Sequence, residues 1–262
     1  MNAMRIVAAA GGRFSRELGI DLDAGRSGDV FRWFLASVLF GARISGTIVT
    51  HTVQAFEQAG VTTPEAVERT GWDGLVAILD RGGYVRYDFK TATKLLDLCR
   101  TLRERYQGDL DRLHAEASDP ADLEERLKAL AKGIGRVTVN IFLREMRGIW
   151  RKARPLPSDL VMLAAGNISL FPRRTVDREQ ALALLQEGWK ESKGRAKDFP
   201  DLESALLRIG NGYCRKKACD ACPVLPLCRS ASGARRRHGT DHYPAARRDR
   251  IRRARGDRVG PA

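Results

Sequence analysis

The sequence predicts an all-α protein. Apolar residues recur at helical spacing along the chain, and no segment shows the strict alternation of a half-buried strand. Glycine and proline fall between the periodic segments, where turns are needed. With 262 residues and 43% hydrophobic residues, the chain can form one large domain or two modest ones, each with its own core.

The first half of the chain is expected to hold a central buried helix. The segment 29–44 is apolar on nearly every side, which is typical of a helix surrounded by others. Thr63 and Pro64 form a strong helix start, with a capping hydroxyl before a proline at the first helical position, and this helix should stop at Gly71. The other helices expected here are 50–58, 72–79 and 89–106.

The second half continues the helical pattern. Asp119 and Pro120 open a helix that should run to about residue 131, and Ser158 should cap a helix near 159–165. Further helices are expected at 137–150, 177–189 and 202–209.

The chain is strongly basic, with 46 Lys and Arg against 32 Asp and Glu and a formal charge of +14. This surplus favours a polyanionic partner, with nucleic acid ahead of an anionic membrane. No apolar run approaches the roughly 20 residues of a membrane helix, and the apolar stretch 6–10 is too short for a signal peptide. We therefore expect a cytoplasmic protein. The segment 233–262 has ten arginines and three aspartates, and we expect a disordered arm that grips phosphates or a frayed terminus.

Four of the five cysteines lie within fifteen residues, in the pattern C-x4-C-x2-C-x5-C. In a reducing compartment this pattern indicates one metal centre and not two disulfides. Zinc and an iron–sulfur cluster both accept four thiolates. Cys99 stands apart, and we expect it to be a small buried apolar residue. The candidate ligands are Cys214, Cys219, Cys222 and Cys228.

A tight turn is expected between two helices at 132–136. Gly133 and Gly135 flank one aliphatic residue, so the backbone N–H groups of the turn are unobstructed. The positive end of the following helix adds to them and makes a cradle for one phosphate. A plain helix–helix connection is the alternative interpretation. The residues expected to form this phosphate site are Lys132, Gly133, Ile134, Gly135, Arg136 and Thr138.

With these two motifs the chain resembles the helix-hairpin-helix DNA glycosylases of the endonuclease III type, over residues 29–230. The resemblance implies a six-helix barrel with the hairpin at 29–150. It also implies an iron–sulfur domain built from both chain ends, 1–28 and 151–230, followed by the basic tail 231–262. The expected cofactor is a [4Fe-4S] cluster, with zinc as the alternative, because the first cysteine interval is two residues shorter than the commonest one in that family.

The resemblance also implies a catalytic carboxylate at Asp159. Such a group stabilises positive charge on the sugar and can activate a water molecule. Members that also cut the DNA backbone have a lysine at the position of Val137, so we expect a monofunctional DNA glycosylase of base-excision repair. The alternatives are a glycosylase and lyase that uses Lys132 or another amine, and a damage-binding protein without catalysis.

Other residues are expected to contact DNA once a base has left the stack. Arg43 is the candidate for filling the gap, and the segment 83–87 corresponds to the region that enters the opposite strand, although ordinary half-buried loop aromatics are the alternative. The partner implied is double-stranded DNA with a damaged or mismatched base, bound by a monomer at the nucleoid. The remaining candidate DNA contacts are Tyr84, Arg86, Tyr87, Arg215, Lys216 and Lys217.

Overall fold

The computed structural model describes residues 3–171 and 177–228, and the basic segment 233–262 lies outside them. In the described residues all regular structure is helical, apart from one isolated bridge between Arg147 and Trp150. The predicted all-α class is therefore confirmed. No helix in this part of the chain is long and apolar enough to cross a membrane. The α-helices are α1 (Ala3–Ala10), α2 (Phe14–Glu17), α3 (Ser27–Phe40), α4 (Gly46–Gln58), α5 (Pro64–Arg81), α6 (Asp88–Tyr106), α7 (Leu110–Glu116), α8 (Pro120–Lys128), α9 (Arg136–Met146), α10 (Asp159–Ile168), α11 (Arg178–Glu191) and α12 (Phe199–Ile209).

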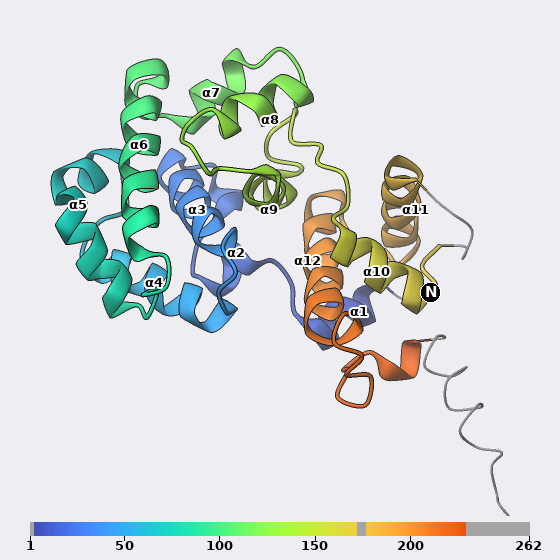
Figure 1. Cartoon of the computed structure of the whole chain (residues 1–262). Helices are drawn as coiled ribbons and strands as arrows, with labels where there is room; N and C mark the ends of the chain where they lie inside the picture. Colours follow the sequence, from blue (N-terminus) through green and yellow to red (C-terminus); the bar gives the residue numbers. More distant parts are fainter. Residues whose placement is uncertain (1–2, 172–176, 229–262) are drawn as a thin grey trace, which may run out of the picture.

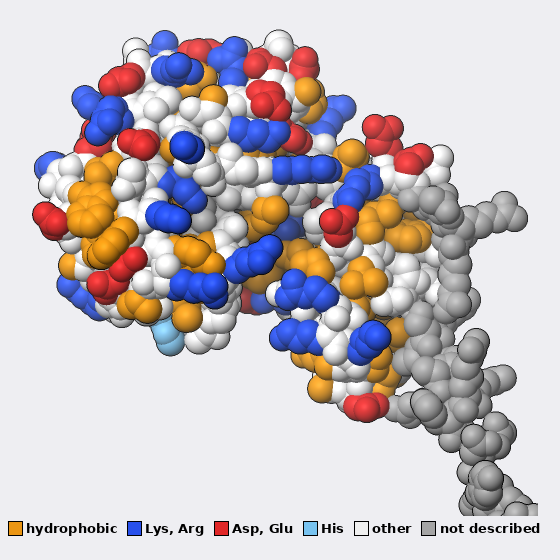
Figure 2. Space-filling model, in the orientation of Figure 1, with side chains coloured by type: hydrophobic (Ala, Val, Ile, Leu, Met, Phe, Trp, Pro, Cys, Tyr) orange, Lys and Arg blue, Asp and Glu red, His pale blue; other side chains and the backbone are white. Residues whose placement is uncertain are grey.

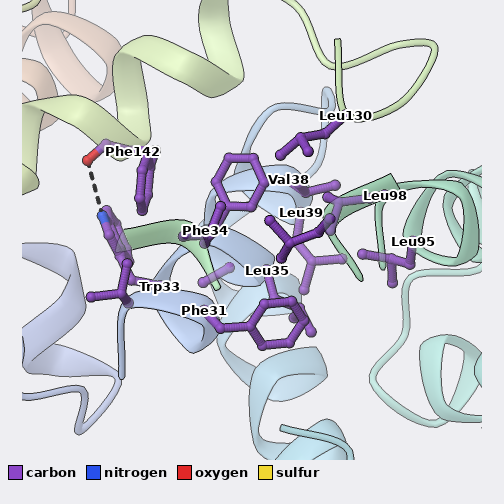
Figure 3. Packing of buried hydrophobic residues seen from close by; sticks show 14 of the residues in the cluster. Phe31, Trp33, Phe34, Leu35, Val38, Leu39, Leu95, Leu98, Leu130 and Phe142 are labelled. Carbon is purple, nitrogen blue, oxygen red and sulfur yellow. Dashed lines mark hydrogen bonds between the residues drawn. The ribbon is translucent and has the colours of Figure 1, made fainter. Parts of the chain in front are cut away.

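The helices form two lobes, and the larger one holds α3 to α9 (Figure 1). Its core is organised around α3, whose residues 29–31 and 33–39 are buried, as the apolar pattern of this segment predicts. The Trp33 indole donates a hydrogen bond of 3.2 Å to the Phe142 carbonyl, which ties α3 to α9 (Figure 3). Phe34 packs edge-on against the Phe142 ring, with ring centroids 4.8 Å apart. The position of α9 is thus fixed by the centre of the core.

The smaller lobe combines helices from both ends of the described chain. Ala3 and Ile6 of α1 are buried in a second hydrophobic cluster with residues of α10, α11 and α12. Figure 1 shows α1 beside α12, and these two helices are in contact. The described chain therefore has two separate apolar cores. That they are a six-helix barrel and a cluster domain stays a prediction.

The expected domain boundary after residue 28 does not coincide with the division between the two apolar cores. Leu18, Ile20 and Leu22 are buried in the core of the larger lobe, although residues 1–28 were expected to join the other domain. Of the residues expected in that domain, those of α1 pack in the smaller lobe, because the apolar face of α1 contacts α12. The residues after α2 pack instead in the core that contains α3. The chain therefore crosses between the lobes near Gly12, two residues before α2.

Most predicted helices are present, and several begin or end a few residues from their predicted limits. Gly71 adopts φ 67° and breaks α5 into two pieces, as predicted. α9 ends at Met146 and not at Trp150, because Arg147 is extended. The short helices α1, α2 and α7 were not predicted, and α3 and α4 begin or end up to four residues from their predicted limits.

Charged groups fill the junction between the two lobes. Arg147 of the larger lobe pairs with Glu203 of α12 at 2.8 Å, and both side chains are almost completely buried. The Glu145 carboxylate accepts hydrogen bonds from the backbone N–H groups of Phe14 and Ser15, each at 2.9 Å. Arg13 is also buried and pairs with Asp198 at 3.2 Å. The two cores are joined by directional polar contacts that permit one relative placement.

The close contact between Gly210 and α10 generates a test of this arrangement. A Cβ at Gly210 would lie 2.8 Å from the Leu160 carbonyl carbon and would overlap its oxygen. We expect Gly210→Ala to lower the free energy of unfolding by about 1–3 kcal/mol, because the backbone of α10 must move. Gly212→Ala is the matched control, since nothing lies within 4 Å of its Cβ. Chemical denaturation measures both, and equal stability of the two variants would contradict the packing described here.

Candidate functional site

The predicted hairpin is a tight turn between α8 and α9. Gly133 adopts φ 91°, a conformation that L side chains rarely reach, so glycine is required there. The Ile134 side chain is 5% exposed and packs in the core, as expected, while its N–H donates to the Ala131 carbonyl at 3.1 Å. Gly135 is the N-cap residue of α9, and a Cβ there would meet nothing within 4 Å. The Ile134 side chain thus anchors the turn in the core, while the Gly135 side of the turn is open to solvent.

The start of α9 has no capping side chain. Six other helices of the described chain are capped by the side chains of Ser45, Thr63, Asp109, Asp119, Ser158 and Asp177. The first N–H groups of α9 lack this kind of partner and are available to an anion, which the helix dipole also favours. Lys132 and Arg136 are exposed on either side. Val137, the second residue of α9, is 63% exposed and presents an apolar surface beside the turn.

The end of α3 brings the turn at 41–45 next to the hairpin. A Cβ at Gly41 would lie 3.3 Å from the Cβ of Thr138 and would overlap its hydroxyl, so backbone and side chain are in close contact. Thr138 is 5% exposed and is therefore a packing residue. Gly41 covers its hydroxyl, so the side chain is not available to a phosphate, and a contact through the Thr138 backbone N–H stays a prediction. Arg43, in the same turn, is exposed and has no hydrogen bond or ion pair within the described residues.

The segment 83–87 also lies near the end of α3, but its Tyr84 side chain points into the core and not toward solvent as expected. Tyr84 is 0% exposed, and its hydroxyl donates to the Leu39 carbonyl at 2.9 Å. Burial raises its pKa to about 12. The expected stacking of Tyr84 on a base is therefore wrong, because its ring closes the core. Tyr87 is partly buried, and the exposed Arg86 lies over its ring at 5.3 Å.

Two exposed aromatic residues near this segment were missed in the sequence. The rings of Trp72 and Phe89 lie 5.2 Å apart, and Trp72 donates to the Thr93 hydroxyl at 3.1 Å. Both are exposed, as is Val85. Their joint exposure could not be read from the sequence, because they lie on α5 and α6 and meet only in the fold.

Asp159 is the first residue of α10. The Ser158 hydroxyl accepts a hydrogen bond from the Val161 N–H at 3.4 Å, so the predicted cap is confirmed and the Asp159 carboxylate is free of that role. The Asp159 side chain is 90% exposed and forms an ion pair with Arg178 of α11. Arg178 also donates to the Pro157 carbonyl, so one guanidinium holds the carboxylate and the segment before it.

The segment that leads to Asp159 is attached to α9. The Asn140 amide donates to the Leu156 carbonyl at 2.8 Å, and Arg147 donates to the Pro155 carbonyl at 2.5 Å. The helix that begins at the hairpin therefore also positions the carboxylate. Asn140 and Arg178 were not predicted as site residues, since no local motif marks them and their partners are 16 and 19 residues away in sequence.

The four clustered cysteines lie in the segment that follows α12, and this segment packs on α10. The Cys228 thiol lies 3.4 Å from the Asn167 carbonyl of α10. Burial raises the pKa of Cys222, a backbone hydrogen bond with Val224 lowers it, and negative charge on Cys214, Cys228 and Cys219 raises it further. Among the described residues, no three His, Cys, Asp or Glu side chains converge as metal ligands. The thiols fit a metal centre by their chemistry and by their spacing in the sequence, and not by ligand geometry.

Basic residues are spread over the face that joins these elements. Figure 2 shows Lys and Arg side chains on both lobes and across the region between them, with few acidic side chains near the middle of this face. Arg215, Lys216 and Lys217 of the cysteine segment are exposed, as expected. Clustered cations of this kind attract a polyanion and hold it without reading its sequence.

The chain matches no protein-family model and no curated protein.

The cysteines differ enough in exposure for a direct test. Cys219 is exposed, whereas Cys99 is fully buried and burial raises its pKa. In protein stripped of metal we expect a thiol-alkylating reagent to modify Cys219 first and Cys99 only after unfolding, because the reagent needs the accessible thiolate. Mass spectrometry of peptides over time measures the order. Modification of Cys99 in the native protein at the rate of Cys219 would contradict the packing of α6.

Proposed function

We propose that this protein is a base-excision DNA glycosylase that acts on double-stranded DNA carrying a damaged or mismatched base. The observation that carries the proposal is the role of α9. Its uncapped start forms an open hairpin for a phosphate, and its Asn140 holds the segment before an exposed carboxylate, Asp159. A phosphate site at the start of α9 and an acidic group whose preceding segment is held by the same helix suit chemistry on a nucleotide sugar.

Asp159 is the proposed catalytic carboxylate. Cleavage of the N-glycosidic bond leaves positive charge on the sugar, which a nearby carboxylate stabilises. A water molecule then attacks the C1′ carbon. The C1′–N bond breaks with its electron pair on the base, a C1′–O bond forms, and the water proton passes to Asp159 and on to the departing base. Arg178 orients the carboxylate before DNA arrives.

The exposed Val137 favours a reaction that leaves the DNA backbone intact. Valine has no amine and forms no Schiff base with the sugar, so the proposed product is an abasic site. Lys132 is exposed in the same turn and is the amine to examine if strand cleavage occurs. The pairing of Asp159 with Arg178 favours a second candidate, a damage-binding protein whose carboxylate is not used in catalysis. We also propose that the protein acts as a monomer on nucleoid DNA.

The four clustered thiols are the proposed ligands of a [4Fe-4S] cluster, with zinc as the alternative. Cys214, Cys219, Cys222 and Cys228 would hold either metal centre as thiolates. A bound cluster would supply a rigid anchor for the segment, and the neighbouring Arg215, Lys216 and Lys217 would then be presented to phosphates. Because Cys228 lies against α10, this anchoring also supports the helix that begins with Asp159.

Duplex oligonucleotides with single lesions test the proposed activity. Uracil, thymine glycol, hypoxanthine, an alkylated purine and 8-oxoguanine are each incubated with the protein, and half of each reaction is treated with hot alkali. We expect cleavage only after alkali, and a loss of at least about 100-fold in rate for Asp159→Asn, because one general acid–base group contributes about that much. Asp177→Asn at another helix start is the matched control and should keep full activity.

Each other outcome of this assay rejects part of the proposal. Strand breaks without alkali would reject the monofunctional reaction, and Lys132→Met would then show whether that amine is used. Tight binding of lesion duplexes without release of any base would favour the damage-binding alternative.

The metal centre has its own test. Protein purified without oxygen should contain iron and absorb visible light, and Cys222→Ser should lower the iron content and the free energy of unfolding. Cys99→Ser is the control that should keep the iron, since Cys99 is buried far from the cluster of thiols in the other core. Zinc in place of iron, with no visible absorbance, would establish the alternative.

A further inference from the structure

Lys94, on α6, lies against the hairpin although two helices, α7 and α8, come between α6 and Gly133 in the chain. A Cβ at Gly133 would lie 3.1 Å from the Cε of Lys94 and 3.5 Å from its Nζ. The ammonium group is thus beside the turn. Glycine at this position serves a second purpose, because it leaves room for the end of the Lys94 side chain.

The Lys94 ammonium has no partner in the described part of the chain. Neither a hydrogen bond nor an ion pair involves it there, and its side chain is half-buried. Burial lowers its pKa, and no nearby carboxylate acts to raise it. A partly dehydrated cation without an acceptor costs folding free energy. The exposed neighbours Lys132 and Arg136 are also cations, so the side chains around the hairpin add positive charge that a bound anion would balance.

We propose that Lys94 is a phosphate-binding residue of the hairpin and contacts the DNA phosphate that the N–H groups at the start of α9 bind. This inference rests on the proposed function, since it requires that the hairpin bind DNA. Lys94 supplies a fixed charge where Lys132 and Arg136 supply mobile ones. Its buried stem is already ordered, so binding costs less side-chain entropy than for an exposed lysine.

The experiment compares Lys94→Met with Arg100→Met. Methionine keeps most of the apolar length and removes the charge. Arg100 is an exposed residue later in α6, and its substitution removes the same charge away from the hairpin. Binding of a fluorescent undamaged duplex is measured by anisotropy between about 50 and 200 mM salt. Each phosphate contact contributes about 0.9 to the slope of log K against log salt concentration.

We expect Lys94→Met to reduce that slope by about 0.9 and to weaken binding about five- to tenfold at 0.1 M salt. Arg100→Met should leave the slope unchanged. The thermal midpoint of Lys94→Met should equal or exceed that of the unmodified protein, because a half-buried charge without a partner is removed. Weaker binding with undiminished stability distinguishes a binding residue from a structural one.

The outcomes separate this inference from the proposed function. If the unmodified protein shows no salt-dependent binding of duplex DNA, the proposed function fails and this inference with it. If the unmodified protein binds and Lys94→Met keeps its slope, only the inference about Lys94 is overturned. A borohydride-trapped adduct of lesion DNA on Lys94, with the slope unchanged by Lys94→Met, would also overturn it and identify Lys94 as an amine nucleophile.

Discussion

The buried ion pair between Arg147 and Glu203 joins the two helices on which the candidate site is mounted. α9 begins at the hairpin and ends beside Arg147, while α12 carries Glu203 and leads into the cysteine segment. Arg147 also holds the Pro155 carbonyl, four residues before Asp159. Separating the two helices would leave each of these charges buried without its partner, which is energetically costly. The pair therefore favours the observed position of the two helices. The hairpin, carboxylate and thiols consequently keep a fixed relation.

The rest of the junction shares this polar character. Glu145 caps the start of α2 through two backbone N–H groups, and Ser204 donates to the same carboxylate at 3.2 Å. Arg144 is buried beside it, and burial lowers its pKa although the neighbouring carboxylates oppose this. Apolar surfaces could slide against each other, whereas the hydrogen bonds to the Glu145 carboxylate form in one alignment. The Nε and Nη2 atoms of Arg144 have no hydrogen-bond partner among the described residues. The junction between the two lobes therefore specifies their relative position more than it strengthens their association.

Local features of the site were predictable, and long-range ones were not. Gly133, Ile134 and Gly135 form a turn by their own conformational preferences, and Ser158 caps α10 with an N–H three residues away, so both were visible in the sequence. The helical period and capping residues likewise gave most helices. The inward position of Tyr84 and the clasp of Arg178 on Asp159 depend on residues 45 and 19 positions away, which no local pattern encodes. Whether a side chain at a loop faces solvent or the core was decided by tertiary packing.

The position of α1 has a consequence for how the protein is made. Its apolar residues Ala3 and Ile6 belong to the core that α12 completes, almost two hundred residues later in the described chain. A chain leaves the ribosome N-terminus first, so α1 must wait without its partner while the core between residues 18 and 153 can already close. The lobe with the hairpin can thus form during translation. The lobe with the thiols forms last, when a folded surface is already present to receive it.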